Sequence, residues 1–178
     1  MTEPPSELRT DRLLLRAPVA DDASAIFDEY AADPDVTRYL MWAPHQKLET
    51  VVEFLQDLID RRLAGQEFSW LLTLPEEGRA IGMIVARVQD CKAEIGYVLG
   101  RKHWNRGYMA EAISAVAEWC LSQPEMFRVS AICDTENVAS ARALEKAGFK
   151  REGELSRWIK LPNRSSEPRD CYIYGRVR

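Results

Sequence analysis

A strand-like run, a short basic loop and the start of an apolar helix follow one another between residues 94 and 112. The run Glu94–Leu99 alternates in side-chain type, the loop ends at Gly107, and the helix begins at Tyr108. Such a junction aims unpaired backbone N–H groups and the positive end of a helix dipole at one point, which favours a phosphate or pyrophosphate. Gly107 lacks the Cβ that would hold the backbone away from such a ligand. The segment predicts a phosphate site, with a packing glycine at a helix start as the alternative.

Other ligand classes fit the sequence less well. The junction has neither the Gly-Lys-Ser/Thr of a P-loop nor the G-x-G-x-x-G of a dinucleotide fold. The cysteines are far apart and form no C-x-x-C pair, so we expect no zinc site and no other metal. Three of them lie in apolar stretches and are expected to be reduced, buried thiols. The four are Cys91, Cys120, Cys133 and Cys171.

The bulk properties are those of one globular domain spanning residues 1–178. The formal net charge of -4 argues against a broad basic face for nucleic acid. No apolar run approaches the roughly 18 residues of a membrane span, and the segment Met1–Ser6 is too polar for a secretory signal. We therefore expect a cytoplasmic protein with no nucleic-acid or membrane partner, and we leave a homodimer open.

Hydrophobic periodicity and turn residues predict an α+β domain with a mixed, mostly antiparallel sheet of about seven strands and about four helices. The expected strands are Arg12–Ala17, Phe68–Leu74, Ala80–Val88, Ala93–Leu99, Arg128–Cys133, Phe149–Lys160 and Asp170–Val177. The expected helices are Asp21–Ala32, Leu48–Ala64, Tyr108–Leu121 and Asn137–Ala147. Gly65 and Gly148 are placed to end two of these helices.

Three blocks of the sequence resemble those of RimJ/RimL-type acetyltransferases of the GNAT superfamily. Gly96–Ala112 resembles the coenzyme A-binding motif, Asn137–Phe149 the motif that follows it, and Thr10–Arg16 the first strand. Their order and spacing agree over roughly Arg9–Glu154. The resemblance implies the GNAT fold and an N-acetyltransferase that uses acetyl-CoA. The acetyl group would pass directly, in a ternary complex, to the primary amine of a protein N-terminus or of a small molecule.

The resemblance also implies which residues contact the coenzyme. Asn137 would lie near its thiol end, and the backbone of Val98, Leu99 and Gly100 would bind its pantetheine arm. Arg101 and Lys102 carry charge suited to phosphate, with simple solvation as the alternative. The pyrophosphate would lie against the loop and the first helical turn, at Asn105, Arg106, Gly107, Tyr108, Met109 and Ala110.

Two of these positions depart from the family. Glycine often stands at Asn105, but asparagine also tolerates left-handed backbone angles. A small residue often stands at Met109, whose larger side chain would narrow the approach unless it points into the protein.

Two residues are candidates for the chemistry that the resemblance implies. Glu94 would deprotonate the amine through water, or it is a solvent-facing glutamate; a backbone N–H near Val98 would stabilise the oxyanion. Many GNAT enzymes protonate the thiolate with a tyrosine where this chain has Leu144. Ser140 would replace it, with a helix-start serine or solvent as the alternatives. A weak base suits an α-amine, about one-tenth neutral at pH 7, better than a lysine, neutral about once in 2,500.

The acceptor pocket is expected across the sheet from the coenzyme, between the first two helices and the last strands. Trp42, His45 and Trp158 are the candidate contacts, since aromatic rings there would stack a planar substrate. Packing is the alternative for both tryptophans. Two other functions compete with the active enzyme. One is a catalytically weak coenzyme A-binding sensor or interaction module, and the other is a related fold that binds a different anion.

Overall fold

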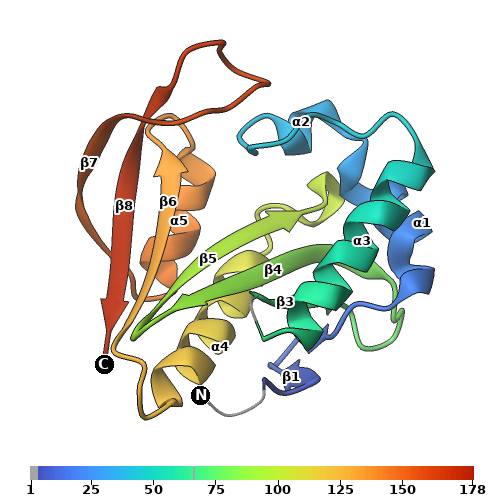
Figure 1. Cartoon of the computed structure of the whole chain (residues 1–178), viewed down its shortest axis with the longest axis horizontal. Helices are drawn as coiled ribbons and strands as arrows, with labels where there is room; N and C mark the ends of the chain where they lie inside the picture. Colours follow the sequence, from blue (N-terminus) through green and yellow to red (C-terminus); the bar gives the residue numbers. More distant parts are fainter. Residues whose placement is uncertain (1–3, 66) are drawn as a thin grey trace.

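The computed structural model describes residues 4–65 and 67–178, which form an eight-stranded sheet with helices on both faces (Figure 1). The strand order is β1-β2-β3-β4-β5-β6-β8-β7, and every neighbouring pair is antiparallel except β5 and β6. The bounds are β1 Glu7–Arg9, β2 Leu14–Arg16, β3 Glu67–Thr73, β4 Ala80–Gln89, β5 Lys92–Leu99, β6 Arg128–Asp134, β7 Lys150–Ile159 and β8 Arg169–Val177. The predicted fold class and all seven predicted strands are confirmed. Strand β1 was not predicted, because three residues are too few to show an alternating pattern.

The four predicted helices are also present, the first of them in pieces. The helical segments are η1 Ala20–Asp22, α1 Ala23–Ile26, η2 Phe27–Ala31, α2 Pro34–Thr37, α3 Leu48–Leu63, η3 Arg101–His103, α4 Tyr108–Ser122 and α5 Val138–Lys146. The segment η2 is a π-helix, which no sequence signal announced. Pro34 follows the end of the first helix and is also the first residue of α2. The Asp33 side chain caps α2 by accepting a hydrogen bond from the Asp35 N–H at 2.8 Å. Gly65 and Gly148 have positive φ angles, as helix-ending glycines do.

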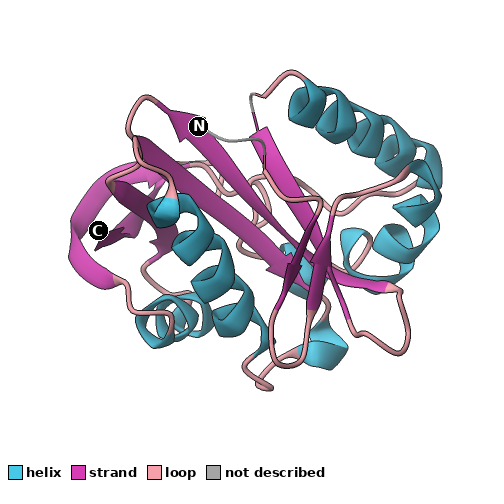
Figure 2. Ribbon diagram, turned by 90° about the horizontal axis from the view of Figure 1, so that it is seen from below, coloured by secondary structure: helices cyan, strands magenta, loops and turns pink. Residues whose placement is uncertain are grey.

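The helices form two layers, one on each face of the sheet (Figure 2). On one face α4 and α5 pack over a core that includes Ile95, Ile113 and Leu144. On the other face α1, α2 and α3 pack over a second core that includes Leu55 and Val98. The alternation expected for the strand at residues 93–99 is therefore confirmed, since neighbouring residues of β5 enter opposite cores. None of the helices in the described ranges is long and apolar enough to cross a bilayer.

Strands β5 and β6 part after a short stretch of pairing, which opens a wedge in the sheet (Figure 1). They pair only from Lys92↔Arg128 to Glu94↔Ser130. Beyond that point β5 continues beside β4, and β6 continues beside β8. In the part of the chain that the structure describes, one backbone edge of Ile95–Leu99 therefore has no neighbouring strand. We call this opening the wedge.

Candidate active site

The N-terminus of α4 has the geometry of an anion site. Gly107 is its N-cap residue with φ of 83°, in the left-handed region, and it offers no side chain to cap the helix. The amides of Tyr108, Met109 and Ala110 have no hydrogen-bond partner among the described residues. Free amides at the positive end of a helix dipole are the groups that bind phosphate. This turn therefore offers the groups that the predicted pyrophosphate site would need.

The two departures from the family pattern are accommodated without closing this turn. Asn105 takes a φ of 60°, the left-handed conformation that asparagine tolerates. The side chain of Met109 points into the protein, where it is 8% exposed within the core beneath α4. The methionine therefore does not occupy the approach to the amides.

The basic residues of the preceding loop are paired with acidic residues of η2 and of the start of α2. Arg101 lies 3.3 Å from Asp33 and 2.8 Å from Asp35. Lys102 and His103 lie 3.4 and 3.1 Å from the Glu29 carboxylate. These contacts hold the loop against η2 and the start of α2. Arg101 and Lys102 thus have acidic partners but stay largely exposed, with 59% and 77% of their side chains accessible to solvent.

Glu111, in the first turn of α4, anchors the N-terminal strands to the candidate coenzyme site. Its carboxylate accepts from Thr10 Oγ1 at 2.5 Å and from Arg12 Nε at 2.8 Å. Arg12 also donates to the Arg106 carbonyl at 2.9 Å, and its guanidinium lies 4.9 Å from the centre of the Tyr108 ring. Burial raises the pKa of Glu111, but the hydrogen bonds from Thr10 and Arg12 outweigh burial and hold the pKa below its ordinary value.

We expect Glu111→Gln to lower the free energy of unfolding by about 1–3 kcal/mol at pH 7, because it leaves Thr10 and Arg12 poorly paired. A carboxyl whose pKa is lowered by folding stabilises the protein above its unfolded pKa. That contribution is lost as the pH falls through the folded value. Urea unfolding should therefore show a gap between wild type and variant at pH 7 that closes towards pH 3. Glu118→Gln, on the exposed side of the same helix, is the control. Equal losses in both variants would contradict the anchoring role.

Glu94 is the last residue of β5 that is paired with β6, so it lies where the wedge begins. Its side chain is exposed on the same face of β5 as Val98, the face that α1 and α3 cover. Its cross-strand neighbour on β4 is Arg87, whose guanidinium is paired with the Glu67 carboxylate at 2.6 Å. Glu94 is therefore accessible to water, as a base acting through water requires.

Ser140 and Asn137 lie together at the N-terminus of α5, on the other side of the wedge. Asn137 is the N-cap residue, and its Oδ1 accepts from Ser140 N–H at 3.2 Å. The Ser140 hydroxyl does not bond to the helix backbone but lies 2.7 Å from the hydroxyl of Tyr97 on β5. The side-chain Nδ2 of Asn137 has no partner among the described residues and could donate to a ligand. Tyr97 was not predicted as a site residue, because its hydroxyl is linked to Ser140 only by the fold.

The three aromatic acceptor candidates do not form one cluster. The Trp42 and His45 rings lie 5.2 Å apart, and His45 Nδ1 lies 2.9 Å from Thr50 Oγ1. Partial burial lowers the pKa of His45, which favours the neutral ring. Trp42 is half-buried against the core beneath α3, as its packing alternative expects. Trp158 is 64% exposed on β7, so packing does not explain it.

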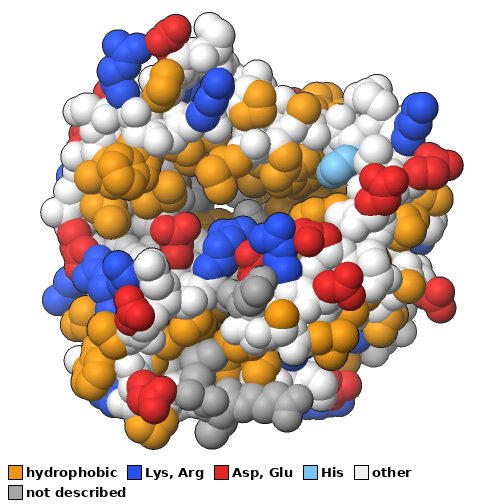
Figure 3. Space-filling view, viewed as in Figure 1, with side chains coloured by type: hydrophobic (Ala, Val, Ile, Leu, Met, Phe, Trp, Pro, Cys, Tyr) orange, Lys and Arg blue, Asp and Glu red, His pale blue; other side chains and the backbone are white. Residues whose placement is uncertain are grey.

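A bridge joins the two walls of the expected acceptor side. Asn163, in the β7–β8 loop, donates to the carbonyls of Thr37 and Trp42 at 2.7 Å each. The guanidiniums of Arg38 and Arg164 lie 5.5 and 5.2 Å from the centre of the Tyr39 ring. Sequence reasoning did not single out Asn163, since a loop asparagine carries no signal of its partner. The face of the sheet below this bridge is hollowed, with apolar side chains above the hollow and basic ones at its lower rim (Figure 3).

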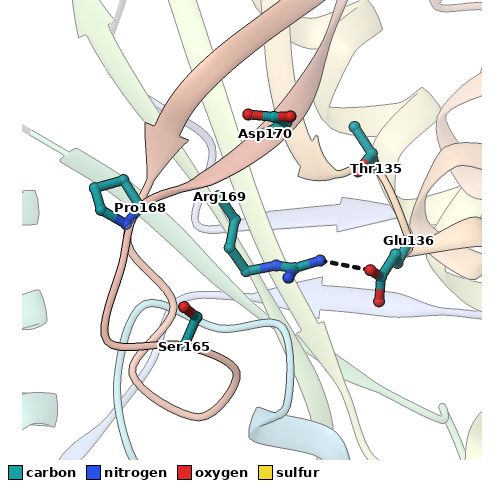
Figure 4. Close-up of a pocket in the computed structure, with 6 residues that line it drawn as sticks. All are labelled: Thr135, Glu136, Ser165, Pro168, Arg169 and Asp170. Carbon is teal, nitrogen blue, oxygen red and sulfur yellow. Dashed lines mark ion pairs between the residues drawn. The ribbon is translucent and has the colours of Figure 1, made fainter.

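A polar pocket of about 330 Å³ lies beside this bridge, between the end of β6 and the start of β8 (Figure 4). Arg169 spans it, paired with the buried Asp134 at 2.6 Å and with Glu136 at 2.9 Å. Burial raises the pKa of Asp134, but Arg169 outweighs burial and holds the pKa below its ordinary value. The lining is hydrogen-bonding rather than apolar. The residues are Thr135, Glu136, Ser165, Pro168, Arg169 and Asp170.

The cysteines lie as expected: Cys120, Cys133 and Cys171 are buried thiols, and Cys91 is exposed. Burial raises the pKa of Cys133 and of Cys171 to about 11, so both are neutral at physiological pH. Neither is therefore a nucleophile of the kind that carries an acyl group. Within the described ranges, no group of acidic, histidine and cysteine side chains is arranged to hold a metal ion.

Comparisons with known proteins agree with this geometry. Residues 12–150 match the family model described as the acetyltransferase (GNAT) domain. The chain is 31% identical over 174 residues to the uncharacterized N-acetyltransferase p20 of Bacillus licheniformis, covering 96% of each protein. It is 26% identical over 166 residues to the ribosomal protein uS5-alanine N-acetyltransferase of Escherichia coli (strain K12), covering 84% of this chain and 81% of that one. Its fold matches the microcin C7 self-immunity acetyltransferase MccE, solved with acetyl-CoA and AMP. The TM-score is 0.88 at 19% identity, over 99% of this chain and 98% of that one.

Proposed function

Because this chain belongs to the GNAT acetyltransferase family, we propose that it transfers the acetyl group of acetyl-CoA directly to a primary amine. The observation that supports this most is the convergence at the wedge. The free amides of Tyr108–Ala110 lie at one end of the unpaired β5 edge, and Glu94 lies at the other. A phosphate-bearing thioester bound along that edge would bring its reacting end towards the candidate base.

Coenzyme binding would use backbone groups more than side chains. The pyrophosphate would accept hydrogen bonds from the first turn of α4, in the segment from Asn105 to Ala110. The pantetheine arm would lie along the open edge of Val98, Leu99 and Gly100. The Leu99 carbonyl already accepts from the Trp104 indole at 2.7 Å, which makes the neighbouring groups the expected partners.

Direct transfer is supported by the state of the thiols. An acyl-enzyme route needs a thiolate near the thioester, and Cys133, close to Ser140, stays protonated because burial raises its pKa to about 11. In a ternary complex the amine nitrogen attacks the carbonyl carbon, and the C–S bond breaks as the C–N bond is kept. Glu94 would accept the amine proton through water, and a β5 backbone N–H near Val98 would stabilise the oxyanion.

Ser140 is the proposed hydrogen-bond donor to the leaving sulfur, in the place where many relatives use a tyrosine. The matching residue, Leu144, is fully buried and has no proton to donate. We expect Ser140→Ala to lower kcat about tenfold, the effect of one hydrogen bond made to developing charge. Ser114→Ala on the surface of α4 is the control and should leave kcat unchanged. An unaltered kcat for Ser140→Ala would assign protonation of the sulfur to solvent.

The acceptor would bind on the α1–α3 side, near Trp42, His45 and Trp158, with the polar pocket beside it. The acceptor amine is that of a protein N-terminus or of a small molecule. The hydrogen-bonding lining around Arg169 favours an acceptor with polar groups near its amine. We propose a cytoplasmic single-domain enzyme with no nucleic-acid or membrane partner, in line with its net charge of -4.

A coenzyme A-binding sensor with little turnover is the second candidate, favoured by the buried Leu144 in place of a proton donor. Two measurements decide between the functions. Calorimetry with acetyl-CoA should show saturable binding whether the protein is an enzyme or a sensor. Thiol release over a panel of N-terminal peptides and small amines should be fast only for an enzyme. Binding without turnover across the panel would support the sensor, and no binding would overturn both.

A further inference from the structure

A hydrogen bond between two hydroxyl groups spans the wedge. Tyr97 lies on β5 three residues beyond the last β5–β6 pair, and Ser140 lies in the first turn of α5. Their oxygen atoms are 2.7 Å apart. Tyr97 packs against the core beneath α4 and α5, so its hydroxyl reaches Ser140 from within the protein. The contact therefore links the Ser140 side chain to β5, whereas the strand that directly precedes α5 in the chain is β6.

The direction of this hydrogen bond decides where the Ser140 proton points. Burial raises the pKa of Tyr97, so the phenol is protonated at all working pH values. A phenol is a better donor than an aliphatic hydroxyl, so Tyr97 is the expected donor and Ser140 Oγ the acceptor. The Ser140 proton is then free for another acceptor.

We propose that Tyr97 is a positioning residue that holds the Ser140 hydroxyl so that its proton points at the leaving sulfur of the coenzyme. This inference rests on the proposed function. As the C–S bond breaks, the sulfur takes the bonding electron pair, and the Ser140 hydrogen bond stabilises that charge. The proton that the sulfur finally gains replaces the one that the amine nitrogen loses, so Ser140 and Tyr97 end the reaction protonated.

The test measures the thiol pKa of bound coenzyme A, which a merely structural role would not move. Ultraviolet absorbance of the thiolate is followed against pH in the complex, with the complex of desulfo-coenzyme A subtracted. For the wild type we expect the thiol of bound coenzyme A to have a lower pKa than the thiol of free coenzyme A. In Tyr97→Phe the ionisation constant should fall about tenfold towards the free value, and kcat should fall about tenfold with KM for acetyl-CoA within about twofold. Ser140→Ala should give the same shift, and the double variant no more than either change alone.

Tyr174→Phe is the matched control, because it also removes a strand hydroxyl that bonds to α5, here at 3.1 Å to Glu145. It should leave the bound thiol and kcat unchanged. Normal binding with an unshifted thiol in Tyr97→Phe would overturn the role of Tyr97 and leave the acetyltransferase proposal standing. An effect of Tyr97→Phe that adds to that of Ser140→Ala would also overturn it, by showing independent action. Failure of the wild type to bind coenzyme A would overturn both proposals.

Discussion

Gly107→Val is expected to weaken acetyl-CoA binding about 100-fold, because a β-branched residue does not tolerate the left-handed backbone of this N-cap. Gly107 has a φ of 83°, and a Cβ there would lie 3.3 Å from Arg12 Nη2. Arg12 is itself held by Glu111, so it has little freedom to move away. Either the side chain or the displaced turn would spoil the alignment of the free amides of α4. Isothermal titration calorimetry with acetyl-CoA measures the loss.

Gly78→Val provides the control for backbone strain alone. Gly78 lies in the turn between β3 and β4 with a φ of 64°, and a Cβ there would meet nothing within 4 Å. This variant should lose stability but bind acetyl-CoA as the wild type does. If Gly107→Val also bound acetyl-CoA normally, the pyrophosphate would have to lie elsewhere.

Glu94→Gln is expected to lower kcat about 100-fold with the Kd of acetyl-CoA within about twofold, since general bases contribute at least that much. Glutamine keeps the size and the exposure of the side chain but cannot accept the amine proton. The residue lies where the wedge begins and away from the α4 amides, so the substitution should lower kcat without weakening coenzyme binding. Steady-state kinetics between pH 6 and 9 with an active acceptor provide the measurement.

Glu76→Gln, at an exposed turn position, tests whether loss of any surface carboxylate matters. It should behave as the wild type. A Glu94→Gln enzyme with an unaltered rate over the whole pH range would remove Glu94 from the mechanism. The acceptor amine would then lose its proton to solvent before it attacked, and an α-amine would tolerate this far better than a lysine.

Elements with a long periodic pattern were predictable from the sequence, and short or irregular ones were not. The apolar stripe of α3 and the alternation of β5 fixed those elements to within a residue or two. Strand β1 and helix α2 were missed because three or four residues carry no period. The π-helical turn η2 was missed for another reason. A π-helical turn has no residue pattern of its own that distinguishes it from an α-helix in the sequence.

The candidate site was predictable where backbone conformation carries the function. Gly107 was singled out because it lacks a Cβ beside the ligand, and Asn105 because asparagine tolerates left-handed angles; both have a positive φ angle. Side-chain partners were not predictable, since Arg101 pairs with Asp33 and Asp35 from a distant segment. Pairings of this kind depend on which loops the fold brings together. The same limit hid the link between Tyr97 and Ser140.

The unpaired edge of β5 has a consequence for the behaviour of the empty protein. A strand that offers bare amides and carbonyls is a template on which another extended chain can add, and natural sheets usually protect such edges. Acetyl-CoA, lying along Ile95–Leu99, would serve as the missing neighbour and hide that template. We therefore expect acetyl-CoA to slow aggregation of the protein during storage and to raise its melting temperature.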